Sequence, residues 1–269
     1  MTTTDSEPPT RLRRAWQDNR VGLCIGVRQA RTPDIAQIAA ACGFDALYVD
    51  LEHSTTPLDT AATICVAARA LGVTPLVRVP EATGRWIGRV LDGGAQGVIV
   101  PHVESPEAAR AIVEQAKYPP VGRRSVGGAG PGNGYRNATL AEINRSGNDG
   151  VIVTVMLETP AGIAAADEIA AVPGVDVLLI GSNDLCTELG IPGQLHDPRL
   201  QQAYRTVADA CRRHDRVLGI GGIRGDLELQ RSLVSLGARL LIAGNDSGYL
   251  MAAAREDVRR INAAFQAPA

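Results

Sequence analysis

The strongest constraint in this sequence is a regular alternation of short β-branched runs with longer runs rich in alanine and leucine. Eight of each follow one another between Val21 and Phe265, at a spacing of about 31 residues that is typical of a βα repeat. Runs such as VIVTVML and VDVLLIG are almost continuously hydrophobic, as expected of strands buried on both faces. Eight such units in about 250 residues predict a (β/α)8 barrel, that is, a TIM barrel.

The predicted strands are the short runs Val21–Val27, Ala46–Leu51, Thr74–Val79, Gly97–Pro101, Val151–Glu158, Val175–Gly181, Arg216–Gly221 and Leu240–Ala243. The predicted helices are Asp34–Ala41, Leu58–Ala70, Thr83–Asp92, Pro106–Ala116, Gly162–Ala170, Arg199–His214, Asp226–Leu236 and Ser247–Phe265. We expect one barrel domain over residues 1–269, with residues 1–10 as a disordered tail. An open doubly wound sheet is the alternative, but the glycines at 127–130 do not follow the first strand, as a dinucleotide fingerprint would.

Composition excludes several classes of function. The formal net charge of −2 leaves no basic excess to neutralise phosphates, so we expect no nucleic-acid partner. No apolar run reaches the roughly 18 residues that span a bilayer, and the first residues lack the apolar stretch of a signal peptide. The five cysteines form no Cys-x-x-Cys pair, which favours free thiols in a reducing cytoplasm. The expected setting is cytoplasmic, with no membrane partner.

Polar side chains gather where the predicted strands end, which is the end of a barrel that carries catalysis. Glu158 and Asp184 end successive strands, and two neighbouring carboxylates can share Mg²⁺ or Mn²⁺. Capping of a helix and a turn is the alternative for this pair. His53 can act as a general base or be a hydrogen-bonded structural residue. Arg78, inside the apolar run LVRVP, must meet a ligand or form an ion pair with Asp50 or Glu52.

One segment, residues 118–150, is too long and too rich in glycine and proline for an ordinary connection. We expect either a functional loop or a surface insertion there.

Seven segments, taken in order, resemble the HpcH/HpaI aldolase family of metal-dependent class II pyruvate aldolases. They are FDALYVDLEHS, PLVRVP, RVLDGGAQGVIVPHVESPEAAR, YPPVGRRSVGG, VMLET, GVDVLLIGSNDL and LLIAGND, and they cover about residues 20–250. The resemblance implies a barrel whose last helix packs on a neighbouring subunit, in a hexamer built as a trimer of dimers. It also implies a divalent metal, Mg²⁺ or Mn²⁺, with Co²⁺ as a third candidate.

The resemblance assigns roles to individual residues. Glu158 and Asp184 match metal ligands, His53 matches the general base, and Arg78 matches the arginine that steadies an enolate oxygen. Asp92 matches an aspartate that raises the basicity of this histidine. Our prediction places Asp92 at the opposite end of the barrel from His53, so either a neighbouring subunit supplies it or it is only a helix-terminal residue.

The resemblance also predicts the substrate-binding residues, which are Met156, Gly181, Ser182, Asn183 and Asp184. Some of these positions depart from the usual family pattern. Related aldolases carry a glycine in place of Leu51, a glutamine in place of Met156, and Gly-Pro-Ala-Asp in place of Gly-Ser-Asn-Asp. We expect a more apolar pocket wall and an altered substrate preference.

The implied activity is that of a carbon–carbon lyase, which cleaves or forms 4-hydroxy-2-oxo acids from a 2-oxo acid and an aldehyde through a metal-bound pyruvate enolate. Decarboxylation of oxaloacetate or a citrate-forming condensation would use the same enolate. A catalytically idle scaffold barrel is a third alternative. Lys117, the only lysine, does not end a strand, which disfavours a Schiff-base mechanism.

Overall fold

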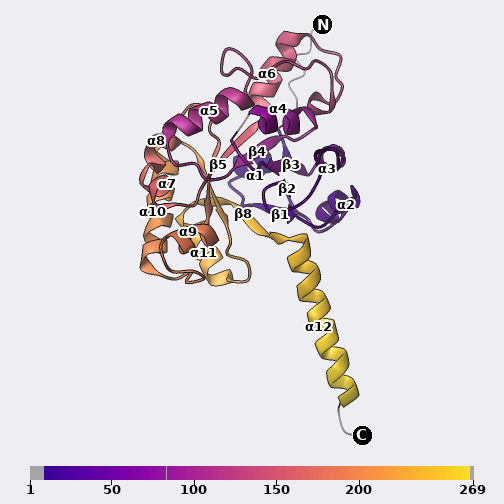
Figure 1. The fold of residues 1–269 in the computed structure, drawn as a ribbon, viewed down its shortest axis with the longest axis vertical. Coiled ribbons are helices and arrows are strands. Elements are labelled where there is room, and N and C mark those ends of the chain that lie inside the picture. The colour runs from indigo at the N-terminus through magenta and orange to yellow at the C-terminus, as the bar shows by residue number, and fades with distance from the viewer. Residues whose placement is uncertain (1–8, 83, 267–269) are drawn as a thin grey trace.

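All eight predicted strands form, and they close into a parallel barrel in the order β1 to β8, with β8 paired to β1. The structure, a computed structural model, describes residues 9–82 and 84–266. The strands are β1 (Gly22–Val27), β2 (Ala46–Asp50), β3 (Thr74–Arg78), β4 (Gly97–Val100), β5 (Ile152–Leu157), β6 (Val177–Gly181), β7 (Val217–Gly221) and β8 (Ala238–Asn245). The predicted (β/α)8 barrel is therefore confirmed, and the open sheet is excluded. Figure 1 shows the strands at the centre of the molecule and the helices around them.

Helices surround the barrel at the predicted places, with differences in detail. They are α1 (Arg11–Gln17), α2 (Asp34–Ala41), α3 (Leu58–Ala70), α4 (Gly84–Asp92), α5 (Pro106–Ala116), α6 (Leu140–Gly150), α7 (Pro160–Ala164), α8 (Ala166–Ala170), α9 (Ser182–Glu188), α10 (Pro198–Arg213), α11 (Leu227–Leu236) and α12 (Asp246–Gln266), with a 3-10 turn at Pro131–Asn133. The predicted helix Gly162–Ala170 is two short helices and begins earlier, at Pro160. Helices α1, α6 and α9 were not predicted.

Helix α1 closes the amino end of the barrel. Leu12 is fully buried and belongs to the cluster that fills the barrel interior. It packs so closely on Gly22 that a Cβ there would lie 2.3 Å from Leu12 Cδ1. Thr10 caps this helix by accepting the Arg13 N–H, so the predicted disordered tail does not extend to Thr10. Residues 1–8 of that tail lie outside the described residues.

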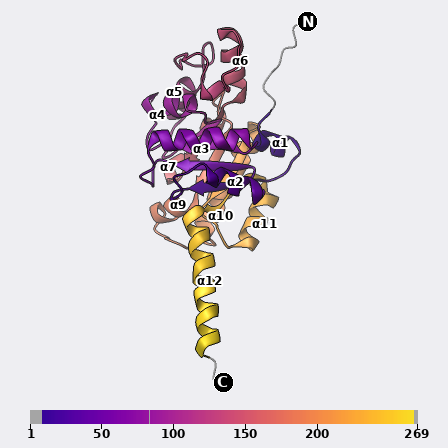
Figure 2. The same cartoon turned by 90° about the vertical axis from the view of Figure 1, so that its right-hand side faces the viewer.

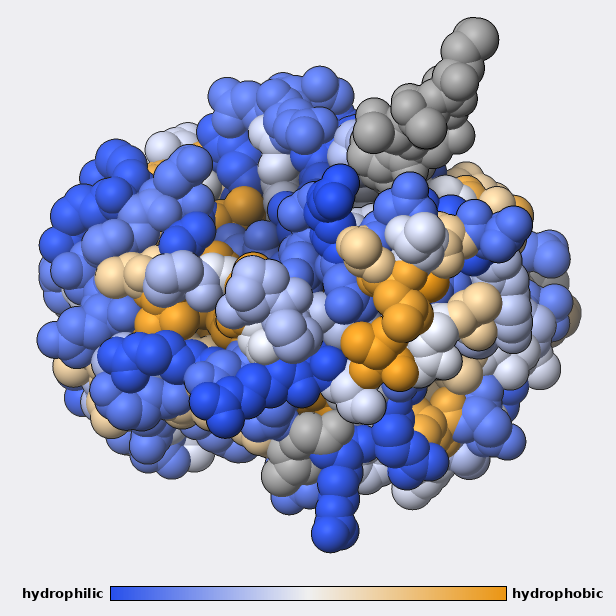
Figure 3. Space-filling model, turned by 90° about the horizontal axis from the view of Figure 1, so that it is seen from above, coloured by the Kyte–Doolittle hydropathy of each residue, from blue (hydrophilic) through white to orange (hydrophobic). Residues whose placement is uncertain are grey.

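The long segment before β5 contains α6. Its first turn carries a capping box, in which Thr139 and Glu142 each bind the other's backbone N–H. The Thr-x-x-Glu spacing was a readable signal, but the helix itself, LAEINRSGNDG, is poor in helix-forming residues. Seen from the end at which α6 lies, the surface is mostly hydrophilic, with hydrophobic residues in small groups (Figure 3).

Helix α12 extends away from the barrel, as two perpendicular views show (Figures 1 and 2). Its exposed side chains include Leu250, Val258, Ile261 and Phe265, the last 84% exposed. Apolar side chains on an isolated helix favour a covering partner, and the expectation that this helix packs on a neighbouring subunit remains a prediction. Within residues 9–82 and 84–266, no helix combines the length and apolar character that crossing a membrane requires.

Candidate active site

A cavity of about 230 Å³ opens at the carboxyl ends of the strands. Apart from Asp92, every residue predicted to act in the site lines this cavity, namely His53, Arg78, Met156, Glu158, Gly181, Ser182, Asn183 and Asp184. Its remaining walls come from Arg28, Tyr48, Ile99, Leu179, Gly221, Gly222 and Ile242. The strand ends therefore bring residues that lie more than 100 positions apart in the sequence to one site.

Glu158, the residue after β5, is the most buried acid of this cavity, at 2% exposure. Its Oε1 accepts the backbone N–H of His102 at 2.9 Å and lies 3.1 Å from Nδ1 of that ring. His102 holds a left-handed backbone, with φ of 53°, which a non-glycine residue rarely adopts. Burial raises the pKa of Glu158, and the charges of Asp184 and Glu52 add to this effect against the opposing influence of His102.

Asp184 lies in the first turn of α9, directly after β6, and faces the same cavity. Because β5 and β6 are neighbours, the two carboxylates stand side by side, and the influence of Asp184 on the Glu158 pKa reflects this proximity. The described residues contain no group of three or more His, Cys, Asp or Glu side chains arranged for a metal. Two oxygen donors beside a small cavity do fit a hard divalent cation, which keeps waters or substrate as its other ligands.

Arg78 ends β3 and is held by two carboxylates. Its Nε and Nη2 bind the two oxygens of Asp50 at 3.0 and 2.6 Å, and its Nη1 lies 2.9 Å from Glu52 Oε2. Burial alone would lower the pKa of Arg78, but the Asp50 hydrogen bond and the negative charges of Tyr48, Asp50 and Glu52 together outweigh it and the pKa is raised. The ion-pair alternative is thus correct for both acids, and the guanidinium still lines the cavity.

His53 sits on the turn after β2, with about half of its side chain exposed. Its backbone N–H donates to Asp50 Oδ1 at 3.1 Å, and its Nε2 lies 3.9 Å from Glu52 Oε2. The ring is therefore placed by backbone contacts of its turn and remains open to the cavity. Such an exposed imidazole can exchange protons with a bound substrate.

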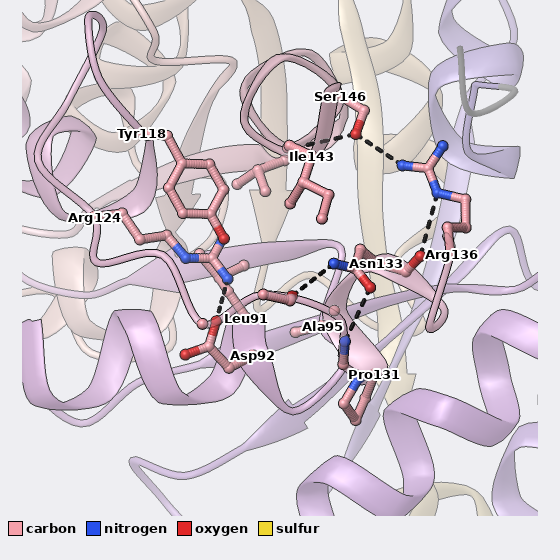
Figure 4. A pocket seen from close by; sticks show the side chains of 16 residues that line it. Leu91, Asp92, Ala95, Tyr118, Arg124, Pro131, Asn133, Arg136, Ile143 and Ser146 are labelled. Carbon is pink, nitrogen blue, oxygen red and sulfur yellow. Dashed lines mark hydrogen bonds and ion pairs between the residues drawn. The ribbon is translucent and has the colours of Figure 1, made fainter. Parts of the chain in front are cut away.

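Asp92 lies elsewhere, at the end of α4 before β4 begins (Figure 4). Its Oδ1 accepts a 2.6 Å hydrogen bond from Arg124, whose guanidinium stacks 4.7 Å from the Tyr118 ring centre. These side chains and the backbone of Gly127 line a separate cavity of about 280 Å³. The described residues of one chain bring no contact between Asp92 and His53, so a joint role would need a neighbouring subunit.

The positions that depart from the family pattern have different surroundings. Met156 points into the barrel, two residues before Glu158, and lines the cavity as the alternation along a strand predicts. The Ser182 hydroxyl accepts a hydrogen bond from Tyr204 at 2.9 Å, on the side of α10. Leu51 belongs to the outer core between the strands and the helices and does not line the cavity. Our expectation that Leu51 makes the pocket wall apolar is therefore wrong.

Three lining or neighbouring residues were missed by sequence reasoning. Arg28 directly follows β1, so the strand-end rule that found Arg78 applies to it equally. Tyr48 stands two residues before Asp50 and points inward, a direction that alternation along β2 gives. The contact of His102 with Glu158 depends on a backbone turn that the sequence does not reveal.

The closed parallel barrel and the position of this cavity place the protein among the (β/α)8-barrel enzymes, whose active sites lie at this end. The family model of HpcH/HpaI aldolase/citrate lyase matches residues 28–253. The chain is 42% identical over 243 residues to "4-hydroxy-4-methyl-2-oxoglutarate aldolase tasA" of Hapsidospora irregularis, covering 88% of this chain and 89% of that protein.

A "Hydroxypyruvate/pyruvate aldolase" of Deinococcus radiodurans is 37% identical over 240 residues, covering 88% of this chain and 83% of that protein. The crystal structure of the HpcH/HpaI aldolase from Desulfitobacterium hafniense DCB-2 superposes with a TM-score of 0.89 at 30% identity, over 96% of this chain and 97% of that one. The chain belongs to the HpcH/HpaI aldolase/citrate lyase family, and it is a carbon–carbon lyase of the aldolase type.

Proposed function

We propose that this protein cleaves and forms 4-hydroxy-2-oxo acids with a divalent metal, Mg²⁺ or Mn²⁺, held by Glu158 and Asp184. The observation that carries the proposal is the pairing of these carboxylates on adjacent strands, in the cavity that also holds Arg78 and His53. The two relatives named above are both aldolases of 2-oxo acids by their names, which supports the substrate class. When bound, the cation supplies Lewis-acid polarisation of the 2-oxo group.

The chain's own residues account for the rest of the chemistry. Arg78, fixed by Asp50 and Glu52, provides a rigid positive charge beside the oxygen on which negative charge develops. His53, open to the cavity, takes the proton of the 4-hydroxyl group as the carbon–carbon bond breaks and returns it in the synthetic direction. The main chain of Gly181–Asp184 lines the cavity where the carboxylate of the 2-oxo acid is to be oriented.

Lys117 takes no part in this scheme. Its Nζ donates to the carbonyls of Asn148 and Val151 at 2.6 and 2.8 Å, at the start of β5. Burial lowers the pKa of this amine, but the group lies at the amino ends of the strands, away from the cavity. We therefore assign Lys117 a structural role.

We further propose a cytoplasmic homo-oligomer, a hexamer built as a trimer of dimers. The exposed apolar side chains of α12 and the distance of Asp92 from its own chain's His53 both support contributions between subunits. Sedimentation analysis of the wild type and of a chain ending before α12 tests the assembly. A monomeric wild type would contradict it.

A panel assay tests the function. 4-Hydroxy-2-oxo acids and oxaloacetate are offered with Mg²⁺, Mn²⁺ or Co²⁺, and pyruvate release is followed with a coupled dehydrogenase. We expect aldol cleavage to exceed oxaloacetate decarboxylation. Faster decarboxylation would favour that alternative, and metal binding without any turnover would favour an idle barrel.

A further inference from the structure

We propose that Arg28 receives a second carboxylate of the substrate, so that the preferred substrates are 4-hydroxy-2-oxo dicarboxylic acids. This inference rests on the proposed function, because it presumes that the 2-oxo acid group lies at Glu158 and Asp184. Its new element is the role of Arg28, since the name of the Hapsidospora irregularis relative already gives a dicarboxylic acid of this kind.

Backbone hydrogen bonds of its turn hold Arg28 in a fixed position. It directly follows β1, and its backbone N–H donates to Asp246 Oδ1 at 3.0 Å. The same carboxylate accepts the N–H groups of Gln29 and Ala30 at 2.9 and 2.7 Å. Asp246 begins α12, so the start of that helix fastens the turn that carries Arg28.

The two arginines of the cavity differ in how many of their nitrogens are paired. Asp50, which is fully buried, binds Arg28 Nε at 2.7 Å and also binds Arg78 through two nitrogens. Arg78 has Glu52 as a second partner, whereas the Nη groups of Arg28 have no partner within residues 9–82 and 84–266. Arg28 therefore has two anchored donors to offer.

Arg28 lies across the cavity from Glu158. In the closed strand order, β1 and β5 lie four strands apart on opposite sides of the barrel. Arg28 and Glu158 thus approach the same cavity from opposite sides, and Tyr48, Ile99 and Leu179 of the barrel interior also line it. A substrate whose 2-oxo acid group lies near Glu158 directs its far end toward Arg28.

A carboxylate at the far end of the substrate suits the free edge of the Arg28 guanidinium. Two coplanar Nη groups match the two oxygens of a carboxylate, and the paired hydrogen bonds are charge-assisted. A hydroxyl or methyl group would leave the Nη groups of the half-buried guanidinium without an anionic acceptor, because Asp50 binds only its Nε. A cavity of about 230 Å³ is at the small end of ligand sites, which disfavours a bulkier phosphate ester.

Binding of two uncleavable probes tests the proposal. 2-Oxoglutarate and 2-oxopentanoate share the 2-oxo acid group and chain length, but only the former carries a second carboxylate. In titration calorimetry with saturating Mg²⁺, we expect the wild type to bind 2-oxoglutarate roughly 10- to 100-fold more tightly, the range given by charge-assisted hydrogen bonds. Arg28→Gln should reduce this preference below about threefold, mainly through weaker 2-oxoglutarate binding.

Two further variants keep the result interpretable. Arg28→Lys keeps a cation beside Asp50 and replaces Arg28→Gln as the test if that variant does not fold. It should show an intermediate preference for 2-oxoglutarate because lysine lacks the planar donor pair. Arg31→Gln removes an exposed arginine that binds carbonyls of the same turn, and it should keep the wild-type preference. If Arg31→Gln and Arg28→Gln lost the preference for 2-oxoglutarate equally, the cause would be disturbance of the turn, and the proposal would be overturned.

A wild type without preference for 2-oxoglutarate, or an Arg28→Gln variant that keeps it, would also overturn the proposal. Failure of the proposed function looks different, because the wild type would then release no pyruvate from any 4-hydroxy-2-oxo acid whatever its binding preference. In the active enzyme, Arg28→Gln should raise the KM for 4-hydroxy-2-oxoglutarate about tenfold or more. The KM for 4-hydroxy-2-oxopentanoate should change by less than about threefold.

Discussion

Alanine at position 181 should disturb the Glu158 carboxylate while leaving the barrel intact. Gly181 ends β6 with φ −86° and ψ 85°, a conformation open to alanine. A Cβ there would lie 2.6 Å from Glu158 Oε2 and 3.1 Å from its Cβ. The carboxylate must retreat by about 0.4 to 0.8 Å to restore a contact of 3.0 to 3.4 Å, and the His102 N–H on Oε1 restrains that movement.

This displacement would move the carboxylate of Glu158, which we propose as a metal ligand. We expect Gly181→Ala to weaken Mn²⁺ binding roughly 10- to 100-fold and to lower kcat/KM for aldol cleavage about 100-fold. The free energy of unfolding should change by less than about 1 kcal/mol, because the loss of glycine also restricts the unfolded chain. Titration of Mn²⁺ by electron paramagnetic resonance, with urea unfolding alongside, measures both effects.

Gly221→Ala is the matched control. Gly221 ends the neighbouring β7 and lines the same cavity, but a Cβ there would meet its nearest atom, Ile242 Cγ1, at an ordinary 3.6 Å. This variant should keep Mn²⁺ affinity within about threefold of the wild type. Wild-type affinity in Gly181→Ala, or an equal loss in both variants, would refute the role given to Glu158.

Three other changes have defined outcomes. His53→Ala should lower the aldol rate by roughly 10²- to 10⁴-fold, and an unchanged rate would leave His53 only a structural role. Met156→Gln should lower the KM for pyruvate about three- to tenfold by restoring an amide donor at the cavity wall, and an unchanged KM would make Met156 a packing residue. Burial alone would raise the pKa of Asp246, but backbone N–H groups, foremost that of Ala30, outweigh it and the pKa lies below its usual value. The Asp246 contribution to stability is therefore present above about pH 4 and is lost as the pH falls through the lowered pKa. Asp246→Asn should lower the free energy of unfolding by about 1–3 kcal/mol at pH 7 in urea titrations. A difference between wild type and variant that stayed constant down to pH 3 would contradict this role of Asp246.

The barrel could be predicted from the sequence because each strand is a short apolar run bounded by polar turns. The strand-end rule then found most of the cavity, since parallel strands deliver their carboxyl ends to one rim. It would also have found Arg28, which stands directly after Val27, had it been applied to the first strand.

Other features depend on tertiary contacts that local patterns do not encode. The short helix α1 is held by burial of Leu12 against Gly22, and nothing in its seven residues alone requires a helix. Leu51 adjoins two site residues in the sequence but faces the outer core, because it follows the last residue of β2 and points away from the barrel interior. The shared role of Asp50 between two arginines depends on the registry of three strands.

Pyruvate release from 4-hydroxy-4-methyl-2-oxoglutarate, measured with and without a chelator, tests whether aldol cleavage requires a metal held by Glu158 and Asp184. We expect chelation to abolish pyruvate release, Mg²⁺ or Mn²⁺ to restore it, and Glu158→Gln to remain inactive with either metal. Full activity in the chelator, or trapping of the substrate on Lys117 by borohydride, would contradict a metal-dependent mechanism.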